Sequence, residues 1–344
     1  MPDKNNLTVA TFNLYNLQLP GKAMYNGTRY SPQQYKEKLE WTADKLIQLD
    51  ADIIAFQELW RPECLRDVIV VANLDDEYTL IAENINSKGM DNAIAVRKPH
   101  EVVKAEWIKN FPEETVLKKR KGRSSDPDYQ ISVNISRFSR AVLSVTLNVV
   151  PTAGAEPVRV RVLAAHLKSK KCIMLDKQEK CDPSIRPHAT ALGQAMSSIR
   201  RTAESAAIRV LVNKMMRSCD DPVIVLGDLN NTEHSVSTAI IAGQPKFYMY
   251  TNNCSASRSD RGLYSTSYMQ GYRSVKDTVF THITDGNMET LDHILVSKQF
   301  YDYSDSRLWT FNNLRCFNDY LADKNDVSSD HAIVSATFDY NPSN

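Results

Sequence analysis

Nine short apolar segments, rich in β-branched residues, recur from residue 8 to residue 338 of the 344-residue chain. Segments of this length that are bounded by polar clusters are typical of β-strands. The predicted strands cover residues 8–13, 52–57, 78–82, 93–97, 141–149, 158–165, 222–226, 291–296 and 332–338. Since no internal repeat or low-complexity linker interrupts the series, we expect one domain spanning residues 1–344.

Amphipathic segments lie between the predicted strands, and the clearest of them covers residues 189–216. Its apolar residues recur at helical spacing: Leu192, Ala195, Met196, Ile199, Ala203, Ala206, Val210 and Leu211. The opposite side carries Arg200, Arg201, Glu204 and Arg209. This pattern predicts a helix whose apolar face lies on a sheet and whose charged face meets water. Further helices are expected over residues 35–49 and 62–74.

The alternation of strands and helices is typical of a layered α/β protein. The neighbouring strands within residues 78–97 and 141–165 resemble hairpins, however, so the sheets should be mixed. We therefore expect an α/β (α+β) fold in which two packed mixed sheets are flanked by helices. No G-x-G-x-x-G or G-x-x-x-x-G-K motif opens a helix, which argues against those nucleotide-binding folds.

The composition is that of a water-soluble globular protein, with 42% hydrophobic and 24% charged residues. Forty-two basic and 41 acidic residues give a net charge of +1, so any affinity for phosphate must be local. The chain lacks a run of about 18 apolar residues and begins without the features of a secretory signal. We expect a cytoplasmic protein without a transmembrane segment, and secretion after removal of a signal peptide is the alternative.

The six cysteines are scattered and form no C-x-x-C pair, which argues against a structural zinc site. Reduced thiols are the expected state. Only Cys172 and Cys181, on either side of a polar stretch, are placed to close a small disulfide loop, and only in an oxidising compartment.

Polar residues able to bind a metal or a phosphate follow the predicted strands again and again. They are Asn13, Glu58, His166, Asp228 with Asn230, Asp292, and Asp330 with His331. Each one alone has a structural explanation: Asn13 suits a turn, Glu58 the first turn of a helix, and Asp228 a helix N-cap. Chance does not readily place so many such residues at consecutive strand ends of one chain.

This ordered series resembles the endonuclease/exonuclease/phosphatase superfamily, which includes DNase I, abasic-site endonucleases, bacterial sphingomyelinases and inositol polyphosphate 5-phosphatases. The matching motifs, in chain order, are Thr11-Phe12-Asn13, Gln57-Glu58, Ala165-His166-Leu167, Gly227-Asp228-Leu229-Asn230, Leu291-Asp292-His293 and Ser329-Asp330-His331. The G-D-x-N and S-D-H motifs are the most specific of these. The resemblance spans almost the whole chain and implies a DNase I-like four-layer αββα sandwich that hydrolyses phosphoric esters with a divalent metal.

The resemblance also implies a role for each residue of the series. Glu58 offers a hard carboxylate to Mg²⁺ or Mn²⁺, and Asn13 and Asp330 are implied as its neighbours at that ion. His331 and Asp292 would form an acid/base pair. The remaining roles are activation of the attacking water by Asp228, positioning of that water by Asn230, and stabilisation of a phosphate oxygen by His166.

Two basic residues are expected to bind substrate. The stretch around Arg140 resembles one in DNase I that places an arginine near the phosphate, although Arg140 equally suits an edge strand. Lys168 follows His166 closely and would meet substrate phosphate or solvate a loop. The histidines His188, His234, His282 and His293 are expected to be structural.

The leading functional hypothesis is a nuclease that hydrolyses DNA or RNA. The dense basic run at residues 118–123 is the best candidate for local contact with a polyanion. The alternative is a lipid or inositol-phosphate hydrolase, because the same core serves those substrates, and residues 247–250 form a short aromatic patch. A catalytically inactive binding module finds no support, since every expected polar position is filled. The oligomeric state is not predicted.

Overall fold

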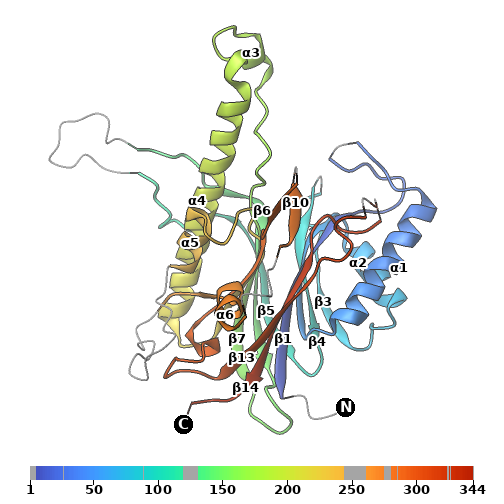
Figure 1. The fold of residues 1–344 in the computed structure, drawn as a ribbon, viewed down its shortest axis with the longest axis vertical. Helices are drawn as coiled ribbons and strands as arrows, with labels where there is room; N and C mark the ends of the chain where they lie inside the picture. The colour runs from blue at the N-terminus through green and yellow to red at the C-terminus, as the bar shows by residue number, and fades with distance from the viewer. Residues whose placement is uncertain are drawn as a thin grey trace, which may run out of the picture.

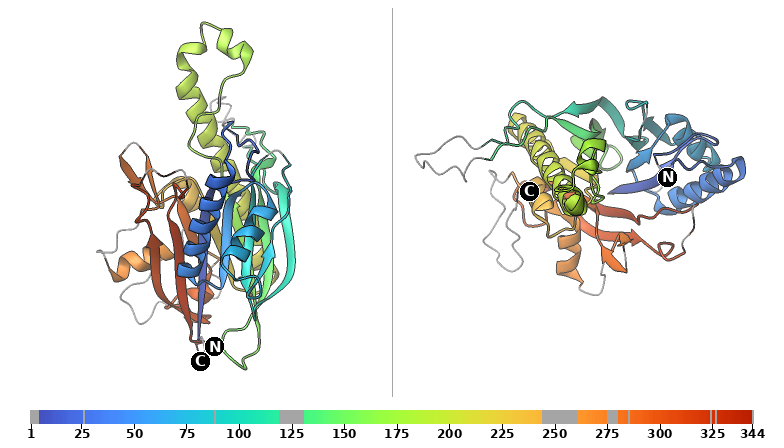
Figure 2. Two further views of the ribbon diagram at one scale, coloured as in Figure 1. Left: turned by 90° about the vertical axis from the view of Figure 1, so that its right-hand side faces the viewer. Right: turned by 90° about the horizontal axis from the view of Figure 1, so that it is seen from above.

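The computed structural model describes residues 5–25, 27–87, 89–118, 131–243, 261–274, 280–284, 286–323, 325 and 327–343. Two six-stranded sheets pack face to face, and helices cover their outer faces (Figures 1 and 2). This arrangement confirms the expected four-layer αββα sandwich of mixed sheets.

The first sheet has the strand order β13-β14-β1-β2-β4-β3. Its strands are β1 (Asn6–Leu17), β2 (Ile53–Leu59), β3 (Tyr78–Ile81), β4 (Asp91–Arg97), β13 (Trp309–Phe317) and β14 (Ile333–Tyr340). Strands β1 and β2 are parallel, and the other neighbours are antiparallel.

The second sheet has the order β5-β6-β7-β8-β12-β9. Its strands are β5 (Glu101–Asn110), β6 (Arg137–Val149), β7 (Val158–His166), β8 (Val223–Asp228), β9 (Tyr264–Ser265) and β12 (Asp292–Val296). Here β7 and β8 form the parallel pair. Alternate apolar residues of both sheets meet in one buried cluster between them, which holds the sandwich together.

Helices α1 (Pro32–Leu49) and α2 (Pro62–Val71) cover the first sheet, while α4 (Ala189–Ser218) and α5 (Val236–Ala242) cover the second. The start of α1 is set by a capping box between Ser31 and Gln34 and by Pro32 in its first turn. The helix α6 (Thr266–Arg273) packs near β12 and β13. None of the described helices is both long and apolar enough to cross a bilayer.

Several short or edge elements are absent from the sequence prediction. They are β5, β9, β13, the hairpin of β10 (His282–Thr284) and β11 (Asn287–Glu289), and the helices α3 (Lys177–Cys181), α5 and α6. The sequence did not predict β5 because it lies at the exposed edge of the sheet, where charged residues interrupt the apolar pattern.

The prediction for the long helix was wrong at two points. Leu192 and Ile199, expected on the sheet, are 44% and 49% exposed, because the N-terminal part of α4 extends beyond the sandwich. There it packs against the preceding segment, and Gly193 permits this: a Cβ at Gly193 would lie 2.5 Å from the carbonyl oxygen of Ile173. Arg201 and Glu204, expected in water, are buried.

We call residues 168–200 the arm, since they form the projection above the sandwich in Figure 1. Cys172 and Cys181 both lie in the arm as free thiols. Two other predicted features, residues 119–123 of the basic run and the aromatic patch at 247–250, lie outside the described residues.

Candidate active site

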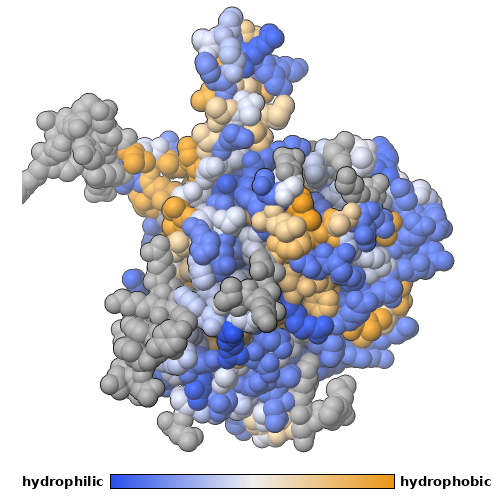
Figure 3. All heavy atoms as spheres, in the orientation of Figure 1, coloured by the Kyte–Doolittle hydropathy of each residue, from blue (hydrophilic) through white to orange (hydrophobic). Residues whose placement is uncertain are grey.

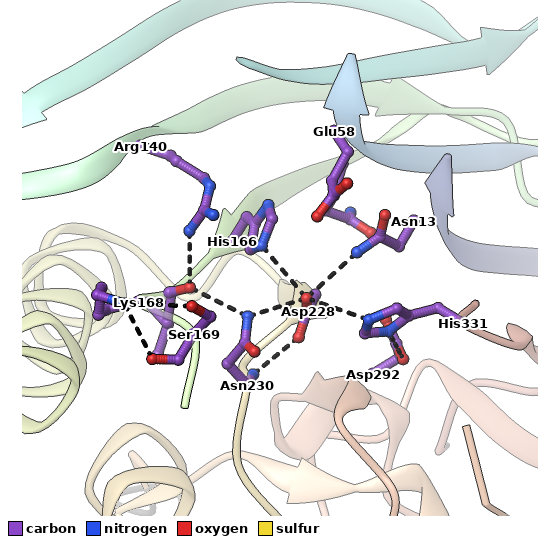
Figure 4. Close-up of polar contacts among 12 residues, drawn as sticks. Asn13, Glu58, Arg140, His166, Lys168, Ser169, Asp228, Asn230, Asp292 and His331 are labelled. Carbon is purple, nitrogen blue, oxygen red and sulfur yellow. Dashed lines mark hydrogen bonds and ion pairs between the residues drawn. The ribbon is translucent and has the colours of Figure 1, made fainter. Parts of the chain in front are cut away.

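The polar residues of the series meet at one edge of the sandwich. Asn13 and Glu58 come from the parallel pair β1 and β2, and His166 and Asp228 end the parallel pair β7 and β8. Figure 4 shows the two groups facing each other between the sheets. The amide nitrogen of Asn13 donates a hydrogen bond to Asp228 Oδ2 at 3.2 Å, which joins the two groups directly.

A break in the first sheet turns Glu58 toward this edge. The pairing of β1 with β2 is irregular between Asn13 and Leu17. Asn16 and Glu58 both have positive φ, 58° and 61°, a conformation that costs energy in residues other than glycine. The backbone N–H of Asn16 donates to Glu58 Oε2 at 3.0 Å, and the indole N–H of Trp60 donates to Asn16 Oδ1 at 3.1 Å. These bonds hold the carboxylate in its strained position.

Asp228 is the centre of the cluster and is 1% exposed. Its Oδ1 accepts the backbone N–H of Asn230 at 2.8 Å, and its Oδ2 accepts the Asn230 amide at 2.9 Å. His166 Nε2 and His331 Nε2 lie 3.3 Å and 3.9 Å from Oδ2. Burial alone would raise the pKa of Asp228, but the charge of His331 and the bonds from His166 and Asn230 outweigh burial and lower it.

The glycine of the G-D-x-N motif is required by close packing. Gly227 has φ of 140°, and a Cβ there would lie 1.9 Å from the carbonyl oxygen of Ala165. The close approach of the two parallel strands brings His166 and Asp228 side by side in the β7–β8 register.

His166 is buried and faces Asp228 through Nε2, while its Nδ1 has no hydrogen-bond partner among the described residues. Burial lowers the pKa of His166, and the nearby charge of Arg140 lowers it further. The imidazole is therefore neutral near pH 7.

His331 forms the second histidine pair of the site. Its Nδ1 lies 2.8 Å from Asp292 Oδ2, and its backbone N–H donates to Ser329 Oγ at 3.0 Å. Ser329 in turn donates to the carbonyl oxygen of Asn13, which ties the S-D-H segment to β1. Burial would lower the pKa of His331, but the carboxylates Asp292 and Asp228 outweigh burial and raise it well above the ordinary value.

The two predicted substrate-binding residues differ in their placement. The Arg140 guanidinium donates to the carbonyl oxygen of Leu167 at 3.0 Å and so borders the segment that follows His166. Lys168 instead bonds through Nζ to the backbone oxygens of Ser169 and Lys171, and Figure 4 shows it pointing away from Asp228.

The sequence prediction missed Glu204, which fixes this segment. Its Oε1 accepts the backbone N–H of Ser139 and its Oε2 accepts that of Lys168, both at 2.7 Å. One buried carboxylate thus holds the backbone of Ser139, next to Arg140, and of Lys168, two residues after His166. The signal available was an acid in the middle of an apolar helix, but helical periodicity assigned it to water.

Lys38 and His282 were also missed as neighbours of the site. Lys38 is fully buried, donates to the carbonyl oxygen of Ser328 at 3.1 Å, and has its pKa lowered to about 7 by burial. His282, expected to be structural, forms a β-bridge with His331, and their rings are 4.8 Å apart. His293 is buried and bonds the carbonyl oxygen of Asn231, in line with a structural role.

The oxygen atoms near Glu58 suit a hard cation. Asn13 turns its amide nitrogen toward Asp228, and its Oδ1 accepts the backbone N–H of Tyr15 at 3.0 Å. Glu58 accepts the N–H of Asn16 through Oε2, and the negative charges of Glu58 and Asp330 both act on the buried Lys38. Carboxylate and carboxamide oxygens are the ligands that Mg²⁺ and Mn²⁺ prefer. The donor set therefore fits the expected ion.

A model of the Endonuclease/Exonuclease/phosphatase family matches residues 137–331. No curated protein sequence matches the chain.

Several solved structures share the fold. Truncated Caenorhabditis elegans TDP2 has 15% identity and a TM-score of 0.54, with 97% of each chain covered. An endonuclease/exonuclease/phosphatase family protein from Bacteroides thetaiotaomicron has 15% identity and a TM-score of 0.55, with 98% of this chain and 95% of that chain covered. D. rerio TDP2 in complex with a single-strand DNA product has 14% identity and a TM-score of 0.54, with 97% and 98% covered. At such identities the likeness shows a shared fold.

Proposed function

Because the chain belongs to the endonuclease/exonuclease/phosphatase family and is a phosphoric ester hydrolase, we propose that it is a divalent-metal-dependent phosphodiesterase that hydrolyses nucleic acid. The observation that carries this proposal is the environment of Asp228. The buried Asp228 carboxylate accepts hydrogen bonds from two carboxamides and faces two imidazoles. A second carboxylate, Glu58, lies opposite it. Phosphodiester hydrolysis needs these groups: a water acceptor, donors for phosphate oxygens, and a cation site.

Glu58, Asn13 and Asp330 would hold Mg²⁺ or Mn²⁺, which supplies a Lewis acid for a phosphate oxygen when bound. Asp228 stays ionised because its pKa is lowered. We assign it as the acceptor of the proton that the attacking water loses as the bond to phosphorus forms. Asn230, bonded to both oxygens of Asp228, positions that water.

The two histidines stabilise charge that develops on the phosphate. His331 is protonated because its pKa is raised, and Asp292 fixes its Nδ1–H, so Nε2–H is free to donate to the phosphate or the leaving oxygen. His166 carries its one proton on Nε2, beside Asp228, and we assign it the donation of this N–H to a non-bridging oxygen once substrate is bound, beside Arg140.

Two observations favour nucleic acid as the substrate. The similar structure of D. rerio TDP2 holds a single-strand DNA product. In this chain, Arg140 borders the segment after His166, and Lys168, Lys170 and Lys171 follow in that segment at the start of the arm, which suits a polyanionic strand.

A panel of substrates tests the proposal. Purified protein would be incubated with plasmid DNA, a single-stranded RNA, sphingomyelin and an inositol polyphosphate, each with Mg²⁺ and with EDTA. We expect EDTA-sensitive cleavage of DNA or RNA. Cleavage of sphingomyelin or the inositol phosphate alone would instead assign the chain to the lipid or inositol-phosphate hydrolases.

A further inference from the structure

A second group of metal-binding side chains lies at the edge of the site and involves His282, Asp330 and His331. One ligand atom from each lies within 4.8 Å of the others. We propose that these three residues form a site for nitrogen-preferring ions such as Zn²⁺, and that occupancy of this site blocks hydrolysis. The inhibitory part rests on the function proposed above.

The backbone holds the two imidazoles beside each other. His282 and His331 form an antiparallel bridge, and the N–H of Ala332 donates to the carbonyl oxygen of Thr281 at 2.7 Å. Thr281 is fully buried, and its hydroxyl accepts the backbone N–H of Leu291 at 2.8 Å. Backbone pairing and the buried hydroxyl of Thr281 therefore fix the position of the segment that carries His282.

Each imidazole is oriented by a hydrogen bond at Nδ1. His331 Nδ1 lies 2.8 Å from Asp292 Oδ2, and His282 Nδ1 lies 2.8 Å from Thr284 Oγ1. Metal-binding histidines are commonly held in this way, with one ring nitrogen bonded to a carboxylate or hydroxyl and the other left for the ion. Nε2 is the nitrogen left available in both rings.

The third ligand, Asp330, is exposed and offers a carboxylate oxygen to the group. Two imidazoles and one carboxylate form a donor set that suits Zn²⁺ or Co²⁺, with a position left for water. This set differs from the oxygen-only group of Glu58, Asn13 and Asp330, so the two sites should prefer different ions.

The site shares two residues with the proposed reaction. An ion bound to His331 Nε2 removes the hydrogen-bond donor that the phosphate needs, and an ion bound to Asp330 competes with the Mg²⁺ site. His282 belongs to the second site alone. A change at His282 therefore separates inhibition from the reaction itself.

Metal-free parent protein and His282→Ala would be titrated with Co²⁺ and followed by visible absorption, which reports nitrogen ligation without any turnover. We expect the parent to show cobalt absorption bands and His282→Ala to lose them or to need at least about 10-fold more Co²⁺, since even neighbouring hydrogen-bond partners of metal ligands are worth that much. The matched control is His188→Ala, which removes an exposed histidine of the arm and should leave the titration unchanged.

In the second arm of the experiment, Zn²⁺ is added to hydrolysis assays that contain Mg²⁺. Zn²⁺ should inhibit the parent and His188→Ala. His282→Ala should need at least about 10-fold more Zn²⁺ for the same inhibition, and its rate without Zn²⁺ should equal that of the parent.

Cobalt bands that are identical in parent and His282→Ala would overturn the site. If the bands depend on His282 but Zn²⁺ inhibits all three proteins equally, the inhibitory role is wrong. If the parent hydrolyses no phosphodiester, the proposed function and the inhibitory role both fail, while the cobalt result still decides the site.

Discussion

Asp228 shows how single residues make this site. A carboxylate this deeply buried is costly unless it is paired, and here four groups lie against it: Asn13, Asn230, His166 and His331. The contacts that stabilise its charge also hold the Nε2 atoms of His166 and His331 near the same carboxylate oxygen, Oδ2. Stability and chemistry therefore depend on one side chain.

The two histidines can be tested individually. His166→Ala and His331→Ala should each lower kcat by about 10² to 10⁴ fold, the usual contribution of a positioned acid/base group. Steady-state hydrolysis of a short labelled oligonucleotide measures the loss, and thermal unfolding shows whether each variant is folded. Near-normal turnover by either folded variant would exclude that histidine from the reaction.

For some of these residues the sequence indicates that the side chains meet in space, and for others it gives no such indication. Asn13, His166 and Asp228 lie at or near the ends of strands with a clear apolar pattern, so their convergence follows from the topology of parallel pairs. Glu204 and His282 carry no such signal, because their positions depend on contacts with segments far away in the chain.

At the scale of elements, the junction of α4 with the second sheet fixes the segments that border the site. Glu204 lies at this junction and fastens the backbone of Ser139 and Lys168. Removing this carboxylate takes the partner from two part-buried N–H groups, and leaving such a group unpaired costs up to about 1 to 3 kcal/mol. The segments that carry Arg140 and His166 are then free to shift.

We expect Glu204→Ala to lower the melting temperature and to reduce kcat/KM by roughly 10 to 100 fold, since small displacements of positioning groups have effects of that order. Glu204→Gln should recover part of both, because its amide oxygen still accepts one of the two N–H groups. As a control, Glu179→Ala changes a carboxylate of the arm that accepts the backbone N–H of Asp176, the N-cap residue of α3. A Glu204→Ala protein of lowered stability but full activity would make Glu204 purely structural.

At the scale of the whole molecule, the main feature outside the αββα sandwich is the arm, which projects beyond the two sheets. None of its described residues belongs to the three apolar clusters of the core. It begins beside the site, where Lys170 pairs with Glu289 of β11 and Lys171 lies over the ring of Tyr25. The first 12 or so residues of α4 extend it by about 18 Å at 1.5 Å per residue.

The charges of the arm suit a nucleic-acid strand that leaves the site. Asp176 and Glu179 bond each other's backbone N–H groups in a capping box, whereas Lys177, Lys180 and Arg186 are exposed, with no ion pair to the described residues. Figure 3 shows the end of the arm as mostly hydrophilic, which does not suit insertion into lipid. The helical periodicity of residues 189–216 could not reveal that α4 leaves the sheet, because the apolar repeat continues into the arm.

Replacing Lys177, Lys180 and Arg186 with serine should weaken binding of a 20-base-pair DNA at low salt. It should also flatten the slope of log K against log salt by about 2, if two of the three charges meet phosphate at about 0.9 each. The control replaces Lys36, Lys104 and Lys214, which lie on α1, β5 and the C-terminal part of α4, and should leave the slope unchanged. An equal effect in both triple variants would point to general charge and remove the arm from the binding surface.

The central claim is that the cluster around Asp228, together with a hard cation near Glu58, hydrolyses phosphodiester bonds in nucleic acid. Its most direct test is cleavage of a labelled oligonucleotide by EDTA-dialysed protein before and after addition of Mg²⁺, for the parent and for Asp228→Asn. We expect no cleavage by the dialysed parent, full recovery with Mg²⁺ or Mn²⁺, and poor recovery with Ca²⁺ because of its looser coordination. With Mg²⁺ or Mn²⁺ added, Asp228→Asn should cleave at least about 10² fold more slowly than the parent. Undiminished cleavage after dialysis, or Mg²⁺-restored cleavage by Asp228→Asn at the rate of the parent, would contradict it.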